Sequence, residues 1–286
     1  MLIINNQQTL NEFCIQLSYA NIISVDTEFT RRTTYYAKLS IIQVRAAKYQ
    51  VIIDVLSGLD LTPLNEIFLN EKILKIFHAP REDFEIFYNL FKQLPQNIFD
   101  IQIAMQVCGL GSNLSYSNIC YQLCGIKIDK THQKSNWLAR PICTNMLDYA
   151  LKDVEYLEPI YKILQDILYK NQLDEEYQRQ IKKLLNIENY KVNFQKAWQK
   201  VKLSNNNCLI FIPKIQILAA YREEIASQID LPRQHFISDE DLIMLCKYLP
   251  INNKEIDDLQ LNSRYLSKQK YRNQLFDLCR GIREEG

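Results

Sequence analysis

The sequence lacks an apolar run that approaches the roughly 18 residues of a membrane-spanning helix, and its mean hydropathy is −0.23. Its first ten residues, MLIINNQQTL, lack the basic region and long apolar stretch of a secretory signal peptide. Glycine and proline are scarce, with 6 and 8 residues, which we attribute to coding bias rather than to chemistry. These absences predict a cytoplasmic protein with no membrane-embedded part.

The sequence also lacks a C-x-x-C pair, although it contains 8 cysteines. Cys120 and Cys124 lie four residues apart, but no second pair and no nearby histidine cluster completes a set of zinc ligands. Reduced, mostly buried thiols therefore explain the cysteines better than a structural zinc site does.

Charge is balanced over the whole chain but not along it. The formal net charge is +1, while residues 170–207 carry eight basic and four acidic side chains. Two interpretations remain open for this basic segment, a solvated helix face and a contact with a polyanion. The lysines that would make such a contact are Lys182, Lys183, Lys196 and Lys200.

The order of apolar patterns predicts a mixed α/β region followed by helices. The length of 286 residues favours about two domains, and 47% hydrophobic residues suffice for a full core. Strands are expected at 21–28, 39–45, 49–55 and 73–78, the first three as an antiparallel meander. Helices are expected at 7–19, 80–93, 101–109, 114–123 and 144–169. Asn205 to Asn207 suggest a linker, and short amphipathic helices follow it.

An acidic pair stands at the end of the first of these strands. Residues 22–25 are mostly β-branched and apolar, which is typical of a buried strand. Asp26 and Glu28 then point to the same face, because side chains alternate along a strand. Two buried like charges repel each other and lose hydration, so they need a partner. A divalent metal ion or an arginine would meet that need.

Three more polar residues are candidates for the same site as Asp26 and Glu28. Asp83 falls in the first turn of the helix expected at 80–93, where an acidic residue also complements the helix dipole. Tyr149 and Asp153 lie four residues apart, so they share one face of a helix. Each of these positions, taken alone, favours a structural role over a functional one.

In chain order these segments resemble the ribonuclease D family of DEDD exonucleases, in its tyrosine branch. The D-x-E motif corresponds to Asp26 and Glu28, and RRTTYYAKLSIIQ follows it. The second motif corresponds to HAPREDFEIF, which contains Asp83, and the Y-x-x-x-D motif to Tyr149 and Asp153. NWLARP resembles a family signature before the third motif. The resemblance implies a ribonuclease-H-like fold over residues 1–170, with a mixed sheet and flanking helices.

The same resemblance implies a function. The four carboxylates of Asp26, Glu28, Asp83 and Asp153 would hold two Mg²⁺ or Mn²⁺ ions for in-line phosphodiester hydrolysis. The Tyr149 hydroxyl would orient the attacking water, since a tyrosine of ordinary pKa near 10 is a poor base at pH 7. The expected activity is a 3′→5′ exoribonuclease that releases 5′-mononucleotides and trims tRNA precursors. A DNA 3′→5′ exonuclease and a catalytically inactive RNA-binding scaffold are the alternatives.

The residues expected to contact substrate carry less specific signals. Arg31, Arg32 and Arg140 would bind phosphates or form surface salt bridges. Phe29 would stack on the terminal base or pack into the core. Trp137 belongs to the NWLARP signature, in which Asn136 replaces an aspartate that is frequent in the family, and PRED replaces a small pair before Asp83. His78 is expected to be a structural cap near the site.

The last part of the chain, 208–286, resembles the helicase-and-RNase-D C-terminal (HRDC) domain, a small helical bundle. Its near-neutral charge argues against strong RNA affinity of its own. The sequence thus predicts an exonuclease domain at 1–170, a basic connector at 171–207 and an all-α HRDC-type bundle at 208–286. It leaves the oligomeric state open, with a monomer slightly favoured.

Overall fold

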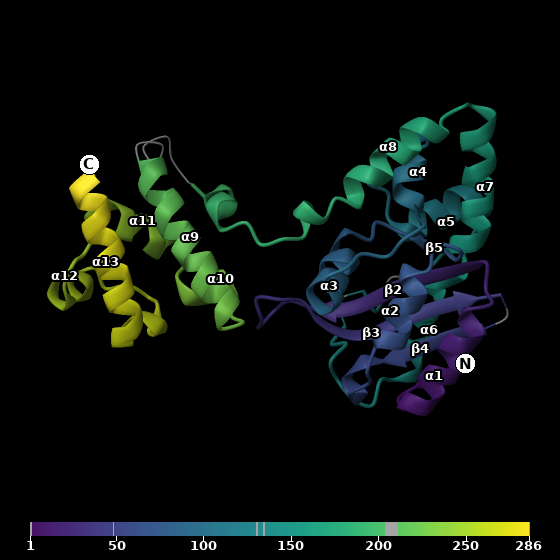
Figure 1. Ribbon diagram of the computed structural model, residues 1–286, viewed down its shortest axis with the longest axis horizontal. Coiled ribbons are helices and arrows are strands. Elements are labelled where there is room, and N and C mark those ends of the chain that lie inside the picture. Colours follow the sequence, from purple (N-terminus) through teal and green to yellow (C-terminus); the bar gives the residue numbers. More distant parts are fainter. Residues whose placement is uncertain (1, 48, 130, 134, 204–210, 286) are drawn as a thin grey trace. The chain divides into compact units, whose positions relative to one another are not determined.

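The computed structural model describes all residues except 1, 48, 130, 134, 204–210 and 286 (Figure 1). The chain forms two compact units. The α/β unit comprises Met1–Thr30 and Ala37–Lys191, and the helical unit comprises Arg31–Tyr36 and Val192–Gly286. The predicted linker at Asn205 to Asn207 lies outside the described residues, as does Cys208.

The α/β unit contains one sheet, in which the described residues form six strands in the order β1-β4-β3-β2-β5-β6. Their bounds are Leu2–Ile4 (β1), Ile22–Thr30 (β2), Lys38–Ala46 (β3), Tyr49–Asp54 (β4), Leu74–Phe77 (β5) and Ile98–Asp100 (β6). The predicted antiparallel meander is confirmed for β2, β3 and β4. The strands β1 and β6, which the sequence analysis did not predict, pair in parallel with β4 and β5. The predicted mixed sheet is therefore confirmed.

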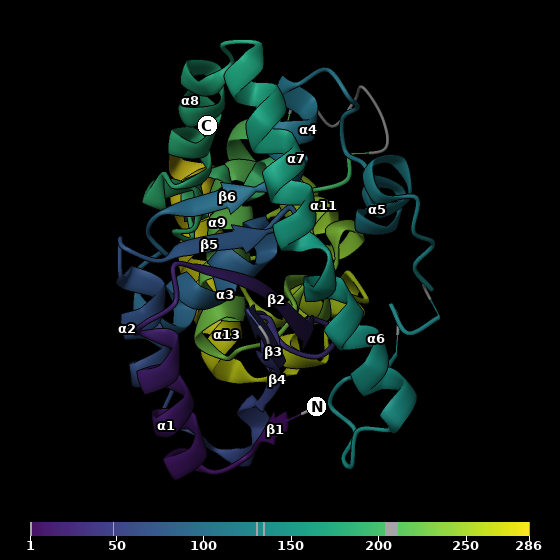
Figure 2. The same ribbon diagram turned by 90° about the vertical axis from the view of Figure 1, so that its right-hand side faces the viewer.

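Alternation along the strands gives the sheet two different faces. One face contributes Val25 and Val44 to the main core, together with apolar residues of α1 (Gln7–Leu17), α2 (Thr62–Leu69) and α3 (Arg81–Phe91). The other face contributes Ile41 and Ile52 to a smaller core with residues of α6 (Thr144–Glu155). Figure 2 shows α1 and α2 on one side of the sheet and α6 on the other. Asp26 and Glu28 pair with Gln43 and Ile41 of β3, and Ile41 belongs to the smaller core. The two carboxylates therefore lie on the side of the sheet that α6 covers.

Eight α-helices of the described residues complete this unit. Their bounds are Gln7–Leu17 (α1), Thr62–Leu69 (α2), Arg81–Phe91 (α3), Ile101–Val107 (α4), Tyr116–Cys124 (α5), Thr144–Glu155 (α6), Leu157–Lys170 (α7) and Asp174–Leu184 (α8). The prediction of a single helix at 144–169 is wrong, because the helix is interrupted at Tyr156 and the segment forms α6 and α7. Pro159 lies in the first turn of α7, and a proline there has no N–H to donate to Glu155.

The helical unit surrounds a second core. Its α-helices are Ile212–Gln228 (α9), Arg233–Phe236 (α10), Asp239–Tyr248 (α11), Asn253–Asp258 (α12) and Gln269–Glu285 (α13), with a 3₁₀ helix at Phe194–Lys200 (η3). Segment Arg31–Tyr36 belongs to this unit although it lies between β2 and β3 in sequence. The Tyr35 hydroxyl donates to Glu223 Oε1 at 2.8 Å, and Asp230 Oδ1 accepts the N–H groups of Tyr35 and Tyr36. These bonds fix the segment to α9 and to the residues that follow it.

The residues of the predicted connector divide between the units. Tyr177 and Ile181 of α8 are buried in the main core of the α/β unit, whereas Ala197 of η3 is buried in the core of the helical unit. The described cysteines are free thiols. Among the helices of the described chain, none combines the length and the apolar composition needed to cross a bilayer.

Candidate active site

The end of β2 places two carboxylates on the side of the sheet that α6 covers. Asp26 and Glu28 point the same way, and a register shift in the pairing with β3 falls between Glu28 and Phe29. Such a bulge bends the strand and changes the direction of the side chains beside it. The acidic pair therefore lies in the regular part of the ladder, directly before the bulge.

The helix α6 adds the third carboxylate. Asp153 lies in its last turn, and one carboxylate oxygen from each of Asp26, Glu28 and Asp153 lies within 4.8 Å of the other two. All three residues are half-buried. Three converging oxygen donors match the preference of Mg²⁺ and Mn²⁺ for carboxylate ligands, so the residues present fit a divalent cation.

Asp83 approaches from α3, on the other side of β2. Its Oδ1 accepts a hydrogen bond from the Thr27 hydroxyl, and Thr27 points away from Asp26 and Glu28. Asp83 is buried and lies outside the cluster of three oxygens. Its charge nevertheless contributes to raising the pKa of Asp26 and of Glu28, so the four carboxylates form one electrostatic group.

Burial raises the pKa of every carboxyl in this group. Burial is the largest cause for all four, and neighbouring carboxylates add to it for Asp26 and Glu28. The pKa rises to about 9 for Glu28, about 7 for Asp153 and about 6 for Asp83, where the Thr27 bond opposes the rise. The pKa of Asp26 also lies well above its usual range. A cation at this site would favour the ionised forms of all four groups.

Tyr149 lies one turn before Asp153 on α6, as the four-residue spacing predicts. Its ring centroid is 6.0 Å from that of His132 and 6.1 Å from that of Trp137. Burial, followed by the charges of Asp153 and Glu28, raises the pKa of Tyr149 above its ordinary value. The phenol therefore stays protonated at neutral pH, and its hydroxyl is available to orient a water molecule rather than to act as a phenolate base.

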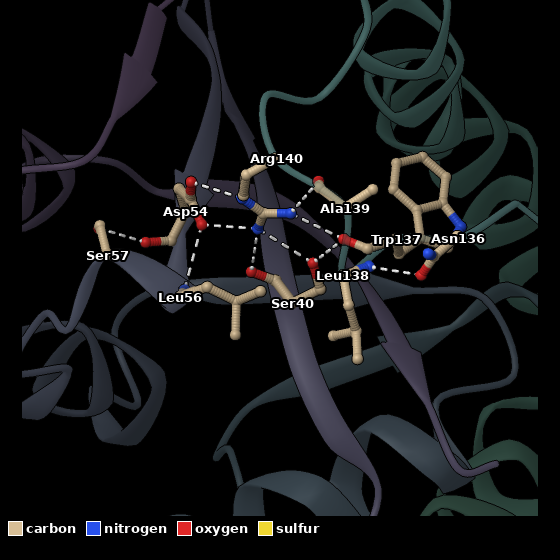
Figure 3. A network of polar contacts seen from close by, with 9 residues as sticks. All are labelled: Ser40, Asp54, Leu56, Ser57, Asn136, Trp137, Leu138, Ala139 and Arg140. Carbon is tan, nitrogen blue, oxygen red and sulfur yellow. Dashed lines mark hydrogen bonds and ion pairs between the residues drawn. The ribbon is translucent and has the colours of Figure 1, made fainter. Parts of the chain in front are cut away.

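Arg140 belongs to a polar network at the NWLARP segment (Figure 3). Its Nε and Nη2 donate to the two carboxylate oxygens of Asp54 at 2.8 and 2.6 Å. Nη1 donates to the carbonyl oxygens of Trp137 and Ala139, and Nη2 also reaches Ser40. This geometry favours the salt-bridge interpretation of Arg140 over phosphate binding, because its donors are already engaged.

The other residues expected to contact substrate occupy varied places. Phe29 is half-buried and packs against the main core, and Trp137 is buried beneath α6. Arg31 and Arg32 belong to the helical unit, as do Lys196 and Lys200, whereas Lys182 and Lys183 end α8 in the α/β unit. The residues expected to contact substrate are therefore distributed over both units.

Sequence reasoning did not assign roles to two buried polar residues beside the site. Gln43 of β3 pairs with Asp26 of β2 and is fully buried. Its side-chain amide atoms have no hydrogen-bond partner among the described residues. Asp100 accepts the N–H of Ala79 at 3.0 Å and so holds the turn that precedes α3. The signal for Gln43 is its position as the one polar residue in the apolar run IIQV.

His78 follows β5 and has the structural role that the sequence suggests. Its Nε2 lies 3.0 Å from the carbonyl oxygen of Leu114, and burial lowers its pKa. His78 is not part of the cluster of three carboxylate oxygens.

The chain resembles known nucleases in sequence and structure. Residues 1–169 match a domain family described as 3′-5′ exonuclease. A ribonuclease D from Bartonella henselae is 36% identical over 247 residues, which cover 85% of this chain and 60% of the relative. A ribonuclease D from Jannaschia sp. is 33% identical, over 90% of this chain and 67% of the relative. The chain spans 60 to 66% of the length of the Bartonella henselae relative and of two other ribonucleases D.

Solved structures give the same result for the fold. The crystal structure of Escherichia coli RNase D, described as an exoribonuclease involved in structured RNA processing, superimposes with a TM-score of 0.87 at 28% identity, over 98% of this chain and 74% of that one. Brucella melitensis NrnC with bound Mg²⁺ has a TM-score of 0.55 at 21% identity, over 66% of this chain and 92% of that one, which shows a shared fold.

Proposed function

The chain belongs to the ribonuclease D family of 3′-5′ exonucleases, and we propose that it is a 3′→5′ exoribonuclease that releases 5′-mononucleotides. One observation carries the proposal: the carboxylate oxygens of Asp26, Glu28 and Asp153 lie within 4.8 Å of one another. Half-buried like charges at this separation are unfavourable without a cation, and an exonuclease of this family requires such a site for its chemistry.

We assign the cation ligands to Asp26, Glu28 and Asp153, with Asp83 joining them at a second position. Two Mg²⁺ or Mn²⁺ ions held by these residues would activate water and stabilise charge on the leaving 3′-oxygen. Burial of the four carboxylates supports this assignment, because a low-dielectric site strengthens their attraction to a cation. For Asp26 and Glu28 the largest influences on the pKa are burial and the charges of neighbouring carboxylates, which favours a bound ion over an arginine partner.

Tyr149 is assigned the orientation of the attacking water. Its protonated hydroxyl can accept a hydrogen bond from the water and donate one to a phosphate oxygen. The water oxygen attacks the terminal phosphorus, and the bond from phosphorus to the 3′-oxygen breaks. The products are a nucleoside 5′-monophosphate and an RNA chain with a new 3′-hydroxyl.

The substrate is assigned as a class of RNA rather than as one RNA. Structured RNA with a free 3′ end, such as a tRNA precursor, is the class we propose, supported by the similarity to Escherichia coli RNase D. We place the enzyme in the cytoplasm. We also assign the chemistry to residues 1–170, RNA contacts to the basic segment 171–207 and to Arg31 and Arg32, and an HRDC-type role to the helices after residue 208.

The experiment that tests the proposal uses matched RNA and DNA oligomers labelled at the 3′ or the 5′ end. With Mg²⁺ or Mn²⁺ we expect immediate release of the 3′ label as a mononucleotide and stepwise shortening of the 5′-labelled RNA. EDTA should stop the reaction. Faster degradation of DNA would replace the RNA assignment by the DNA exonuclease, and binding without degradation would favour an inactive scaffold.

A further inference from the structure

The junction between α6 and α7 contains a hydrogen-bond arrangement that a continuous helix would not have. In a regular helix the Tyr156 N–H would donate to the carbonyl oxygen of Lys152. Here the Tyr156 N–H donates to the Tyr116 hydroxyl at 3.0 Å, and this hydroxyl donates to the Lys152 carbonyl oxygen at 3.0 Å. The hydroxyl of Tyr116 is thus inserted into the helix ladder, as happens at sharp helix kinks.

The neighbouring proline does not account for this arrangement. Pro159 removes the hydrogen bond that the Glu155 carbonyl would receive, which lies further along the chain. The groups bridged by Tyr116 are Lys152 and Tyr156, and both could bond directly if the helix continued by one more residue. Pro159 explains why a break occurs, whereas Tyr116 holds the broken turn in one geometry.

Tyr116 is itself held firmly within the α/β unit. It is the first residue of α5, and its side chain is buried. The ring centroid of His78 lies 5.9 Å from that of Tyr116, and His78 Nε2 bonds the Leu114 carbonyl two residues before it. His78 stands between β5 and α3, the helix that carries Asp83. Tyr116 therefore joins the segment that leads to Asp83 to the turn that carries Asp153.

We infer that Tyr116 is a positioning residue that sets the direction of the Asp153 carboxylate for cation binding. Asp153 lies between the two residues that the hydroxyl bridges, so the geometry of this turn determines where its side chain points. The inference deepens the proposed function and rests on it, because it concerns a ligand of the proposed metal site. Partners behind a ligand orient it, and removing them lowers metal affinity by about 10 to 100-fold in known sites.

The test is the variant Tyr116→Phe, which keeps the ring and removes the bridging hydroxyl. The Tyr156 N–H and the Lys152 carbonyl can then bond directly, and the turn should rotate Asp153. We expect the Mn²⁺ affinity of the RNA-free protein, measured by electron paramagnetic resonance titration, to fall about 10-fold. The exonuclease rate should fall at low Mn²⁺ and recover as Mn²⁺ is raised.

The matched control is Tyr190→Phe. Tyr190 is also buried in the α/β unit, and its hydroxyl donates to the Leu184 carbonyl at the end of α8 at 2.7 Å. Both variants lose a hydroxyl-to-helix-carbonyl bond, so both should unfold at lower urea concentration. Only Tyr116→Phe should change the Mn²⁺ affinity, which a purely structural role would not do.

The outcomes separate this inference from the proposed function. Wild-type Mn²⁺ affinity in Tyr116→Phe would overturn the inference, and so would a variant that does not fold by circular dichroism, since Tyr116 would then be a folding determinant. If the unaltered protein binds no Mn²⁺, or if Asp26→Asn does not weaken Mn²⁺ binding, the metal site and the proposed function fail instead.

Discussion

The two units of the chain bury charged side chains in opposite ways. In the α/β unit, burial and like charges raise the pKa values of Asp26 and Glu28. In the helical unit, fully buried Arg222 donates from Nη1 to Asp239 Oδ1 at 2.7 Å. Burial raises the pKa of Asp239, but the bonds from Arg222, Lys202 N–H and Gln234 outweigh it, and the pKa falls below its usual range.

This difference separates charged side chains that stabilise the fold from charged side chains that serve the proposed metal site. A buried ion pair whose carboxylate accepts further hydrogen bonds joins segments of chain, and here Asp239 joins α9, α11 and the backbone at Lys202. A buried group of carboxylates destabilises the metal-free fold and has value only when a cation binds. Removing a charge should therefore have opposite effects on stability in the two units.

The largest expected effect is loss of activity in the α/β unit without loss of folding. Asp26→Asn removes one ligand and one of the repelling charges. We expect the exonuclease rate to fall about 10³-fold, comparable to the loss of other strong electrostatic contributions to catalysis. In the same variant the urea midpoint of the metal-free protein should stay equal or rise. A lower midpoint would show that Asp26 stabilises the fold and would remove the contrast between the units.

The second prediction breaks the pair in the helical unit. Arg222→Leu leaves Asp239 buried without its cation, which costs about 3–5 kcal/mol in comparable cases. We expect the helical unit to unfold at much lower urea concentration, while degradation of a short single-stranded RNA continues. Trp198 lies in the helical unit and Trp137 in the α/β unit, so the fluorescence of Trp137→Phe and Trp198→Phe backgrounds reports each unit separately. An unchanged Trp198 transition would contradict the prediction.

The third prediction concerns Tyr149, the uncharged member of the site. Tyr149→Phe keeps the ring between His132 and Trp137 and removes the hydroxyl. The rate should fall roughly 10²-fold if the hydroxyl orients the water, within the usual range for such groups. Mn²⁺ affinity should remain unchanged, in contrast to the Tyr116 variant. Full activity at saturating Mn²⁺ would reduce Tyr149 to a packing role.

The sequence predicts the α/β fold well where pattern decides structure. The meander from β2 to β4 is confirmed because strong β-branched runs with short connections have few alternatives. The strands β1 and β6 were missed because each is only three residues long. The helix expected at 144–169 failed because its break depends on Pro159 and on Tyr116, 40 residues before Tyr156.

For the site, spacing places some residues and not others. Tyr149 and Asp153 follow from helix periodicity, and Asp26 and Glu28 from strand alternation. Three of the four expected ligands converge, but nothing in the spacing shows that Asp83 bonds Thr27. The assignment of Arg31 and Arg32 to the helical unit depends on Glu223 and Asp230, about 190 residues away in sequence. Long-range contacts of this kind leave no local pattern.

The fourth prediction uses pH to separate the units. A carboxyl whose folded pKa is raised stabilises the fold below its unfolded pKa, near 3.8 for aspartate, and this contribution is lost as pH rises through the folded pKa. The metal-free α/β unit should therefore lose stability, by up to about 1.4 kcal/mol per pH unit for each of these carboxyls, from about pH 4 through the values of about 6 for Asp83, about 7 for Asp153 and about 9 for Glu28.

The helical unit should respond in the opposite direction. Folding lowers the pKa of Asp239, so its carboxylate stabilises the folded unit at pH values above the pKa of the unfolded chain. This stabilisation is lost as pH falls through the lower pKa of the folded state. Urea unfolding between pH 3 and 8, followed through Trp137 and Trp198 separately, checks both signs. Adding Mg²⁺ should reverse the trend of the α/β unit, since ionised carboxylates bind the cation. Parallel trends in the two units would contradict the comparison.

The smallest expected effect concerns the lysines that the sequence grouped into one basic segment. Lys182 and Lys183 are exposed at the end of α8 in the α/β unit, whereas Lys200 in the helical unit pairs with buried Glu223 at 3.1 Å. A lysine that already pairs with a carboxylate has less to gain from a phosphate. Removing one lysine–phosphate interaction reduces the slope of log K against log salt by about 0.7 on single-stranded RNA.

We therefore expect Lys182→Gln with Lys183→Gln to reduce this slope by about 1.4, and Lys196→Gln with Lys200→Gln to reduce it by about half as much. Lys200→Gln alone should weaken RNA binding little, because it chiefly removes the pair with Glu223. Binding of a single-stranded RNA from low to moderate salt, with Mg²⁺ replaced by Ca²⁺ to prevent cleavage, measures both slopes. Unchanged slopes in both pairs would assign these lysines to solvated helix faces, and a larger change in the second pair would assign the RNA contact to the helical unit.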